Sequence, residues 1–253
     1  MKERLTTGLI LLAVFVALIW INNFVLNFLI FAAMLVCAFF ESVKIYKLKK
    51  ESRYLVLVAL GFFAVMPFLT LEEPFSAAIK VSVLMVVSVA SVIAFIKYPT
   101  MKILLPFIYP CVPIFIMFGL YSDLGIFYFV WMIFIVIASD SGAYFVGKAF
   151  GRIEFSKSSP NKTLEGVIGG FVFALVVSFI YAKIFTNLEV KEILATTIVV
   201  SVFGVFGDLF ESYLKRRANV KDSGTIFPGH GGVLDRIDGY MFGAIAMFLI
   251  YSW

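Results

Sequence analysis

Residues 208–238 read DLFESYLKRRANVKDSGTIFPGHGGVLDRID, and strongly apolar segments lie on both sides of this stretch. It holds five of the chain's sixteen acidic residues and the single histidine, His230. Apolar residues dominate elsewhere, since the chain is 62% hydrophobic. Polar chemistry is therefore concentrated in one segment, and we expect that segment to lie at one edge of a membrane.

The composition predicts a membrane protein built from helices. Only 15% of the 253 residues are charged, whereas a soluble domain usually carries about a quarter, and the mean hydropathy is +1.03. The apolar runs are long and continuous, whereas the strands of a membrane barrel alternate over roughly ten residues. Basic cytoplasmic loops explain the net charge of +5 better than nucleic-acid binding does. We therefore predict an all-α polytopic integral membrane protein with no nucleic-acid partner.

The apolar runs predict about nine transmembrane helices. Their ranges are 5–21, 25–40, 54–69, 76–96, 103–120, 125–145, 164–185, 193–209 and 239–253. The first range is expected to be an uncleaved anchor, because no small-residue cleavage site follows it. We expect residues 1–120 to form a lipid-facing scaffold of five spans. Residues 121–253 are expected to form the catalytic region, with cytoplasmic loops at 147–163 and 215–236.

The basic residues predict the orientation of these spans. Lysine and arginine gather in alternate loops, beginning with the N-terminus, and cytoplasmic loops carry such an excess. The N-terminus and the stretch 208–238 are therefore expected on the cytoplasmic side, and the C-terminus on the outer side.

The eighth predicted span ends in a polar stripe. Its members have the spacing i, i+3, i+4, i+7, which places them on one helix face; they are Asp208, Glu211, Ser212 and Lys215. Asp208 directly follows an apolar run, and acidic residues at such a depth are usually functional. A solvated helix end is the alternative interpretation.

Asp235 and Asp238 stand one turn apart at the predicted start of the last helix. They could interact simply with the helix dipole. Two carboxylate-bearing helix ends joined by one loop could also meet around Mg²⁺, which uses one or two carboxylates plus substrate phosphates. The loop offers phosphate-binding charge and flexible backbone at Lys215, Arg216, Lys221, Arg236, Gly224, Gly229, Gly231 and Gly232. For His230, phosphate contact, acid catalysis and turn structure all stay open.

A second polar group lies earlier in the chain. Asp140, Tyr144 and Lys148 share one face of the sixth predicted span, and Lys162 and Thr163 follow in a cytoplasmic loop that could touch phosphate. The glycines nearby are expected to be small-residue contacts between helices. They are Gly166, Gly169 and Gly170, and the pairs Gly147/Gly151 and Gly204/Gly207.

Four segments carry a family resemblance. They read SxxKRxxxxKD at 212–222, PGHGGxxDRxD at 228–238, SDSGAYxxGK at 139–148 and SPNKTxEG at 159–166. Together they resemble the signature of the phosphatidate cytidylyltransferases, also called CDP-diacylglycerol synthases. The resemblance covers the C-terminal half, while the N-terminal spans match only in hydrophobic character. Asn161 stands where the pattern leads us to expect a basic residue.

The resemblance implies a reaction and its setting. CTP and phosphatidate would give CDP-diacylglycerol and pyrophosphate in phospholipid biosynthesis. The reaction would require Mg²⁺, and two-metal chemistry would add a second cation. The family resemblance implies a homodimeric enzyme of the bacterial inner membrane, with its active site on the cytoplasmic side. Its partners would be CTP, phosphatidate and the lipid bilayer.

The resemblance also implies residue roles. The metal ligands would be Asp208 and Asp235, with Asp238 and Asp222 behind them. The catalytic candidates are Asp208, Asp235, Lys215, Asp238 and His230. The candidates for binding substrate or phosphate are Ser212, Lys215, Arg216, Lys221, Arg236, Lys162, Thr163, Asp140 and Tyr144.

Two other functions are considered. A CTP-dependent polyprenol or dolichol kinase-like enzyme could share the part that handles CTP. A membrane transporter would also place Lys80, Asp140 and Asp208 inside membrane helices. It would not need the glycine-rich cytoplasmic loop.

Overall fold

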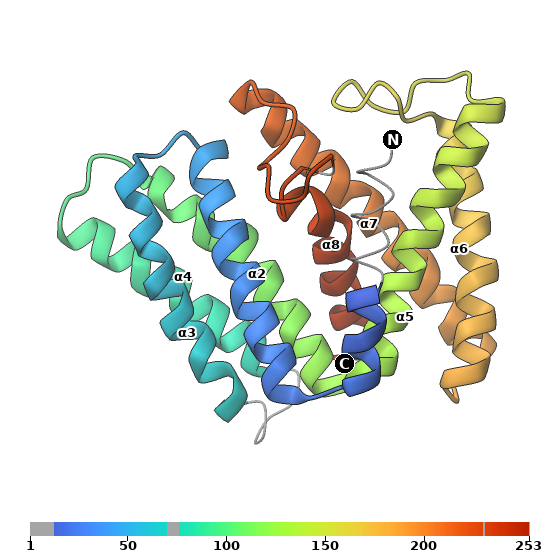
Figure 1. The fold of residues 1–253 in the computed structure, drawn as a ribbon, viewed down its shortest axis with the longest axis horizontal. Coiled ribbons are helices and arrows are strands. Elements are labelled where there is room, and N and C mark those ends of the chain that lie inside the picture. The colour runs from blue at the N-terminus through green and yellow to red at the C-terminus, as the bar shows by residue number, and fades with distance from the viewer. Residues whose placement is uncertain (1–12, 70–75, 230, 253) are drawn as a thin grey trace. The chain divides into compact units, whose positions relative to one another are not determined.

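Most of the residues that the structure describes lie in helices. The computed structural model describes residues 13–69, 76–229 and 231–252 (Figure 1). Residues 13–21 are helical. The helices that follow are α2 (Phe24–Ile45), η1 (Lys50–Leu55), α3 (Val56–Leu69), α4 (Ser76–Phe95), η2 (Met101–Leu104), η3 (Phe107–Cys111), α5 (Val112–Phe150), α6 (Leu164–Phe185), α7 (Val190–Ala218) and α8 (Leu234–Tyr251). The predicted all-α class is therefore confirmed for the described residues.

Six helical stretches among the described residues are long and apolar enough to cross a membrane. They are Phe24–Ile45, Lys50–Leu69, Ala77–Phe95, Met101–Phe150, Leu164–Phe185 and Val190–Ala218. The stretch Met101–Phe150 contains two predicted spans, and Gly125 interrupts its helical conformation with φ of 81°. The chain is thus a multi-pass membrane protein, while the count of nine spans and the orientation of the termini stay predictions. The first predicted span lies partly outside the described residues.

The chain forms two compact units. The first contains residues 1–123 and 217–237, and the second contains residues 124–216 and 238–253. The chain passes between them three times, the last time within α8. The roles predicted for residues 1–120 and 121–253 stay predictions.

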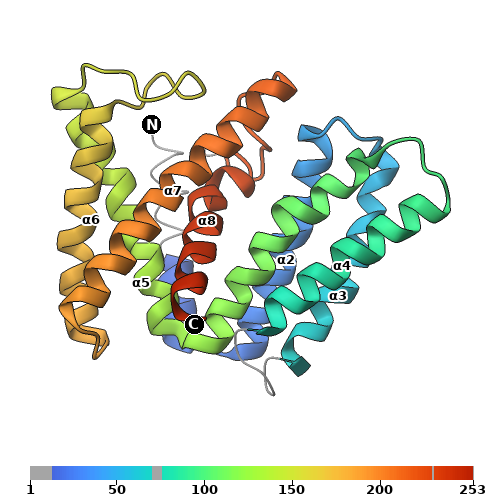
Figure 2. The ribbon, with the colours of Figure 1, turned by 180° about the vertical axis from the view of Figure 1, so that it is seen from behind.

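Aromatic side chains fill the core of the first unit. Helices α2, α3 and α4 lie side by side in both views (Figures 1 and 2). The ring of Phe63 in α3 stacks on Phe28 of α2 at 5.0 Å, and Phe118 packs edge-on against Phe63 at 5.1 Å. Asn27 donates a buried hydrogen bond of 2.7 Å to the hydroxyl of Tyr121, so the polar group in this apolar core is satisfied.

Glycines set the helix contacts of the second unit between α5 and α6. A Cβ at Gly170 would lie 2.5 Å from the carbonyl oxygen of Ser139, and one at Gly166 would lie 2.7 Å from that of Ala143. Only glycine lets the two backbones approach so closely. For Gly166 and Gly170, the predicted role as helix contacts is confirmed.

Candidate active site

The polar stripe of α7 forms as its spacing predicts. In the second unit, Ser212 donates to Asp208 at 3.4 Å, and Lys215 pairs with Glu211 at 3.3 Å. The side chain of Glu211 is fully buried. A buried carboxylate is costly unless it is paired, so the ion pair with Lys215 offsets the cost of burying Glu211.

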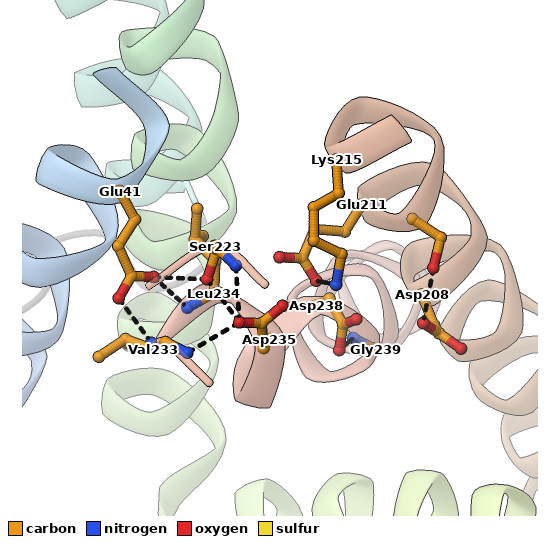
Figure 3. A network of polar contacts seen from close by, with 12 residues as sticks. Glu41, Asp208, Glu211, Lys215, Ser223, Val233, Leu234, Asp235, Asp238 and Gly239 are labelled. Atoms are coloured by element: carbon orange, nitrogen blue, oxygen red, sulfur yellow. Dashed lines mark hydrogen bonds and ion pairs between the residues drawn. The ribbon is translucent and has the colours of Figure 1, made fainter. Parts of the chain in front are cut away.

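Asp238 of α8 joins this stripe because α7 and α8 cross closely. A Cβ at Gly207 would lie 2.5 Å from the carbonyl oxygen of Asp238 and 3.0 Å from the Cβ of Phe242. Through this glycine contact, the Asp238 side chain comes within hydrogen-bonding reach of Glu211 and into the electrostatic field of Asp208. Figure 3 shows Glu211, Lys215 and Asp238 gathered together. Three carboxylates and a lysine thus form one polar cluster in the second unit.

The second polar group of the sequence reaches the same cluster. Lys162, in the loop between α5 and α6, forms a salt bridge with Asp208. Asp140 of α5 lies within electrostatic range of both Lys162 and Asp208. We call these six residues the carboxylate–lysine cluster: Asp140, Lys162, Asp208, Glu211, Lys215 and Asp238. The structure therefore brings together two sets of residues that the sequence showed separately.

The loop that carries Lys162 is held by the start of α6. Thr163 caps that helix by accepting from Gly166 at 3.2 Å. Glu165 accepts from the backbone N–H groups of Arg152 and Ile153 at 3.1 and 3.2 Å. The bond to Thr163 satisfies one of the free N–H groups at the start of α6, and the two bonds to Glu165 tie that helix start to the chain just after α5. Thr163 thus has a structural role, and its predicted contact with phosphate stays a prediction.

Tyr144 is exposed, with Lys148 located 5.9 Å from its ring centroid. Arg216 is exposed near the end of α7. Their predicted contacts with substrate also stay predictions.

The first unit contains a second polar network, centred on Glu41 of α2 (Figure 3). Glu41 accepts from the hydroxyl of Ser223 at 2.9 Å and from the backbone N–H groups of Val233 and Leu234 at 2.9 and 2.8 Å. Asp235 accepts from the N–H and the hydroxyl of Ser223, both at 2.8 Å, and from the N–H of Gly232 at 2.7 Å. Asp235 therefore organises the loop before α8.

Sequence reasoning missed Glu41 and Ser223. The available signal was that Glu41 directly follows an apolar run, as Asp208 does.

A pocket of about 510 Å³ lies on the same loop of the first unit. Lys221 and Arg236 line it, together with Asp222, Thr225, Phe227, Pro228 and the glycines Gly224, Gly229 and Gly231. Two of the predicted phosphate-binding cations are therefore brought together. A pocket with two cations and accessible backbone suits a phosphate group.

The four carboxylates predicted as metal ligands are divided between the two units. Among the residues that the structure describes, no group of three or more histidine, cysteine, aspartate and glutamate side chains is arranged to hold a metal ion. Asp208 and Asp238 belong to the second unit, whereas Asp222 and Asp235 belong to the first. His230 lies outside the described residues, so its role stays a prediction.

The chain is thus a multi-pass membrane protein whose second unit contains a cluster of charged side chains. Comparison with known proteins identifies its family. The sequence profile of the Cytidylyltransferase family matches residues 2–253. The chain is 38% identical over 250 residues to the phosphatidate cytidylyltransferase of Helicobacter pylori strain J99, covering 98% of this chain and 91% of that protein.

Two further relatives have the same name. The phosphatidate cytidylyltransferase of Bacillus subtilis strain 168 is 35% identical over 256 residues, covering 96% of this chain and 94% of the relative. That of Thermotoga maritima is 32% identical over 265 residues, covering 100% and 96%. The chain therefore belongs to the Cytidylyltransferase family, and it is a nucleotidyltransferase. This finding confirms the resemblance and extends it to the N-terminal half.

Proposed function

We propose that this protein transfers CMP from CTP to phosphatidate, which yields CDP-diacylglycerol and pyrophosphate. The observation that carries the proposal is similarity along the whole chain to curated phosphatidate cytidylyltransferases. A shared nucleotide-binding segment alone would not extend over both halves of the chain. The multi-pass architecture also suits a substrate that resides in a lipid leaflet.

The carboxylate–lysine cluster fits the chemistry of this transfer. The nucleophile is an oxygen of the phosphatidate phosphate, which attacks the α-phosphorus of CTP. The bond from that phosphorus to the bridging oxygen breaks, and pyrophosphate leaves with the electron pair. A phosphate monoester is already largely ionised near neutral pH, so the step needs no strong general base. Positioning and charge neutralisation then provide most of the catalysis.

The donor set of the second unit suits Mg²⁺. This ion takes oxygen ligands, commonly one or two carboxylates together with substrate phosphates. Asp208 and Asp238 supply two carboxylates that are close enough to interact electrostatically. A third protein ligand is not required, because substrate phosphates and water commonly complete the coordination of Mg²⁺. We propose these two residues as ligands, and Asp235 and Asp222 stay candidates from the sequence. Bound Mg²⁺ would neutralise charge on the phosphates as pyrophosphate forms.

In this proposal, the two lysines of the cluster stabilise negative charge on the phosphates. Each ammonium group offers three N–H donors. Lys162 lies against Asp208, and Lys215 lies against Glu211. These pairs keep positive charge beside the carboxylates, where it can stabilise anionic phosphate oxygens. Lys221 and Arg236 are proposed to bind phosphate in the pocket of the first unit.

Several details of the setting are part of the same proposal. The active site would lie on the cytoplasmic side of the inner membrane, where CTP is available. A homodimer is also proposed, on the family resemblance alone.

The proposal is tested by pyrophosphate release from the purified protein in detergent. CTP, Mg²⁺ and phosphatidate are omitted one at a time. Release that requires all three, with CDP-diacylglycerol in the lipid extract, is the expected result. A transporter would show no such turnover in detergent without a sealed membrane.

A further inference from the structure

Glu41 is an acidic residue buried in an apolar helix. Its side chain is part of the first unit, and the residue is only 6% exposed. Burying a carboxylate without compensation is costly. Its two oxygens are compensated by three donors from residues 223–234, up to 193 positions away in the sequence. A buried charge with such distant partners fixes one segment of the chain on another.

Two of these donors belong to the start of α8. Leu234 is the first residue of that helix, and Val233 precedes it. The first N–H groups of a helix have no partner within the helix, and negative charge near them is favourable. Glu41 satisfies two of these groups from a different helix. It therefore fixes where α8 begins relative to α2 inside the first unit.

The third donor links Glu41 to Asp235. The hydroxyl of Ser223 lies 2.9 Å from Glu41 and 2.8 Å from Asp235. A hydroxyl carries a single hydrogen, so it donates to one carboxylate at a time. The backbone N–H of Ser223 donates to Asp235 as well. Ser223 is thus held between two carboxylates, and the loop around it is fixed at both sides.

Two glycines of the loop lie directly against the Glu41 carboxylate. A Cβ at Gly224 or at Gly232 would collide with Glu41 Oε1. Both positions therefore require glycine if the loop is to approach this carboxylate. Gly224 also lines the pocket that contains Lys221 and Arg236. One wall of the pocket therefore packs against Glu41 through Gly224.

We propose that Glu41 is a positioning residue, which holds residues 221–229 and 231–234 in the conformation that forms this cationic pocket. The inference rests on the proposed function for its kinetic consequence, because CTP would be the ligand whose phosphates occupy the pocket. Glu41 itself touches no substrate in this proposal. It acts through Ser223, Gly224 and the start of α8.

The test compares Glu41→Gln with the control Glu51→Gln in the full-length protein in detergent. The amide of glutamine has one accepting oxygen and one donating nitrogen, so one bond of the network is lost. Glu51 is an exposed acid of the same unit, and its substitution changes the net charge equally. Hydrogen exchange of residues 221–234 reports on the anchor without any catalytic activity. Steady-state kinetics with CTP and phosphatidate reports on its consequence.

For Glu41→Gln we expect faster exchange of the amides of residues 223 and 232–234, with exchange in α3 and α4 unchanged. We also expect KM for CTP to rise at least about tenfold, since small misplacements of binding groups are expensive, while KM for phosphatidate changes less than about twofold. Glu51→Gln should match the wild type. If Glu41→Gln does not fold, Ser223→Ala replaces it, with faster exchange at residues 221–225 as the expected result.

Unchanged exchange in these segments overturns the inference. So does an equal rise in both KM values with faster exchange throughout the unit, because that pattern indicates a general loss of packing. If the wild type transfers no CMP, the proposed function fails. Faster exchange confined to residues 221–234 in the variant would still support the anchor in that case.

Discussion

Gly207→Ala is predicted to inactivate the enzyme by separating two helices, without removing any catalytic side chain. The added Cβ would lie 2.5 Å from the carbonyl oxygen of Asp238, whereas comfortable contacts between heavy atoms are about 3.5 Å. The backbone of α8 at Asp238 must therefore shift by about 1 Å. This displacement would move Asp238 away from Glu211 and Asp208, with which it interacts.

The expected loss of activity follows from the cost of displacing Asp238. A shift of about 1 Å in a reacting geometry can reduce the rate by about 100-fold, and overpacking costs about 1–3 kcal/mol of stability. Gly204→Ala is the matched control on the same face of α7, because its nearest contact would be 3.4 Å, with Val136. That distance is an ordinary contact, so activity within about threefold of the wild type is expected there.

The assay is pyrophosphate release at saturating CTP, with thermal unfolding in detergent measured in parallel. We expect Gly207→Ala to remain folded and to lose about 100-fold in kcat. Equal activity of the Gly207→Ala and Gly204→Ala enzymes would show that the close crossing of α7 and α8 does not position Asp238.

Three further predictions address single residues. Asp208→Asn should abolish turnover in the folded, Mg²⁺-saturated protein, and near-normal activity would contradict its role as a metal ligand. Lys221→Gln should raise KM for CTP by about tenfold through loss of a charged contact of about 1.5 kcal/mol; a similar increase in the exposed-arginine control Arg217→Gln would show only a general charge effect. Thr163→Ala should lower the free energy of unfolding by about 1 kcal/mol through loss of a helix cap, whereas Thr163→Ser should retain it.

The sequence predicted the parts of the site that follow local rules. The spacing of Asp208, Glu211, Ser212 and Lys215 determines that they share a helix face, and the structure confirms this. The close helix contact at Gly207 also follows from the absence of a side chain. The first rule depends on helix geometry alone, and the second depends on the small size of glycine, which favours close contacts between helices without naming the partner.

The parts that depend on distant pairing were not predictable. Lys162 pairs with Asp208, and Glu41 accepts from Leu234. No periodicity connects positions so far apart in one sequence, because their proximity follows from how the helices pack. Thr163 shows a related limit, since a threonine before a helix can cap it or contact a ligand. The hydrogen bond to Gly166 shows that it caps α6.

In the proposed function, the group transferred from CTP is CMP, and its acceptor is phosphatidate. The most direct test uses CTP labelled at either the α- or the γ-phosphate, with the purified protein, Mg²⁺ and phosphatidate in detergent. We expect the α label to appear in the lipid extract as CDP-diacylglycerol and the γ label to be released in pyrophosphate. Transfer of the γ label to a lipid alcohol such as a polyprenol, with no α label in lipid, would contradict the proposed function and identify a CTP-dependent kinase.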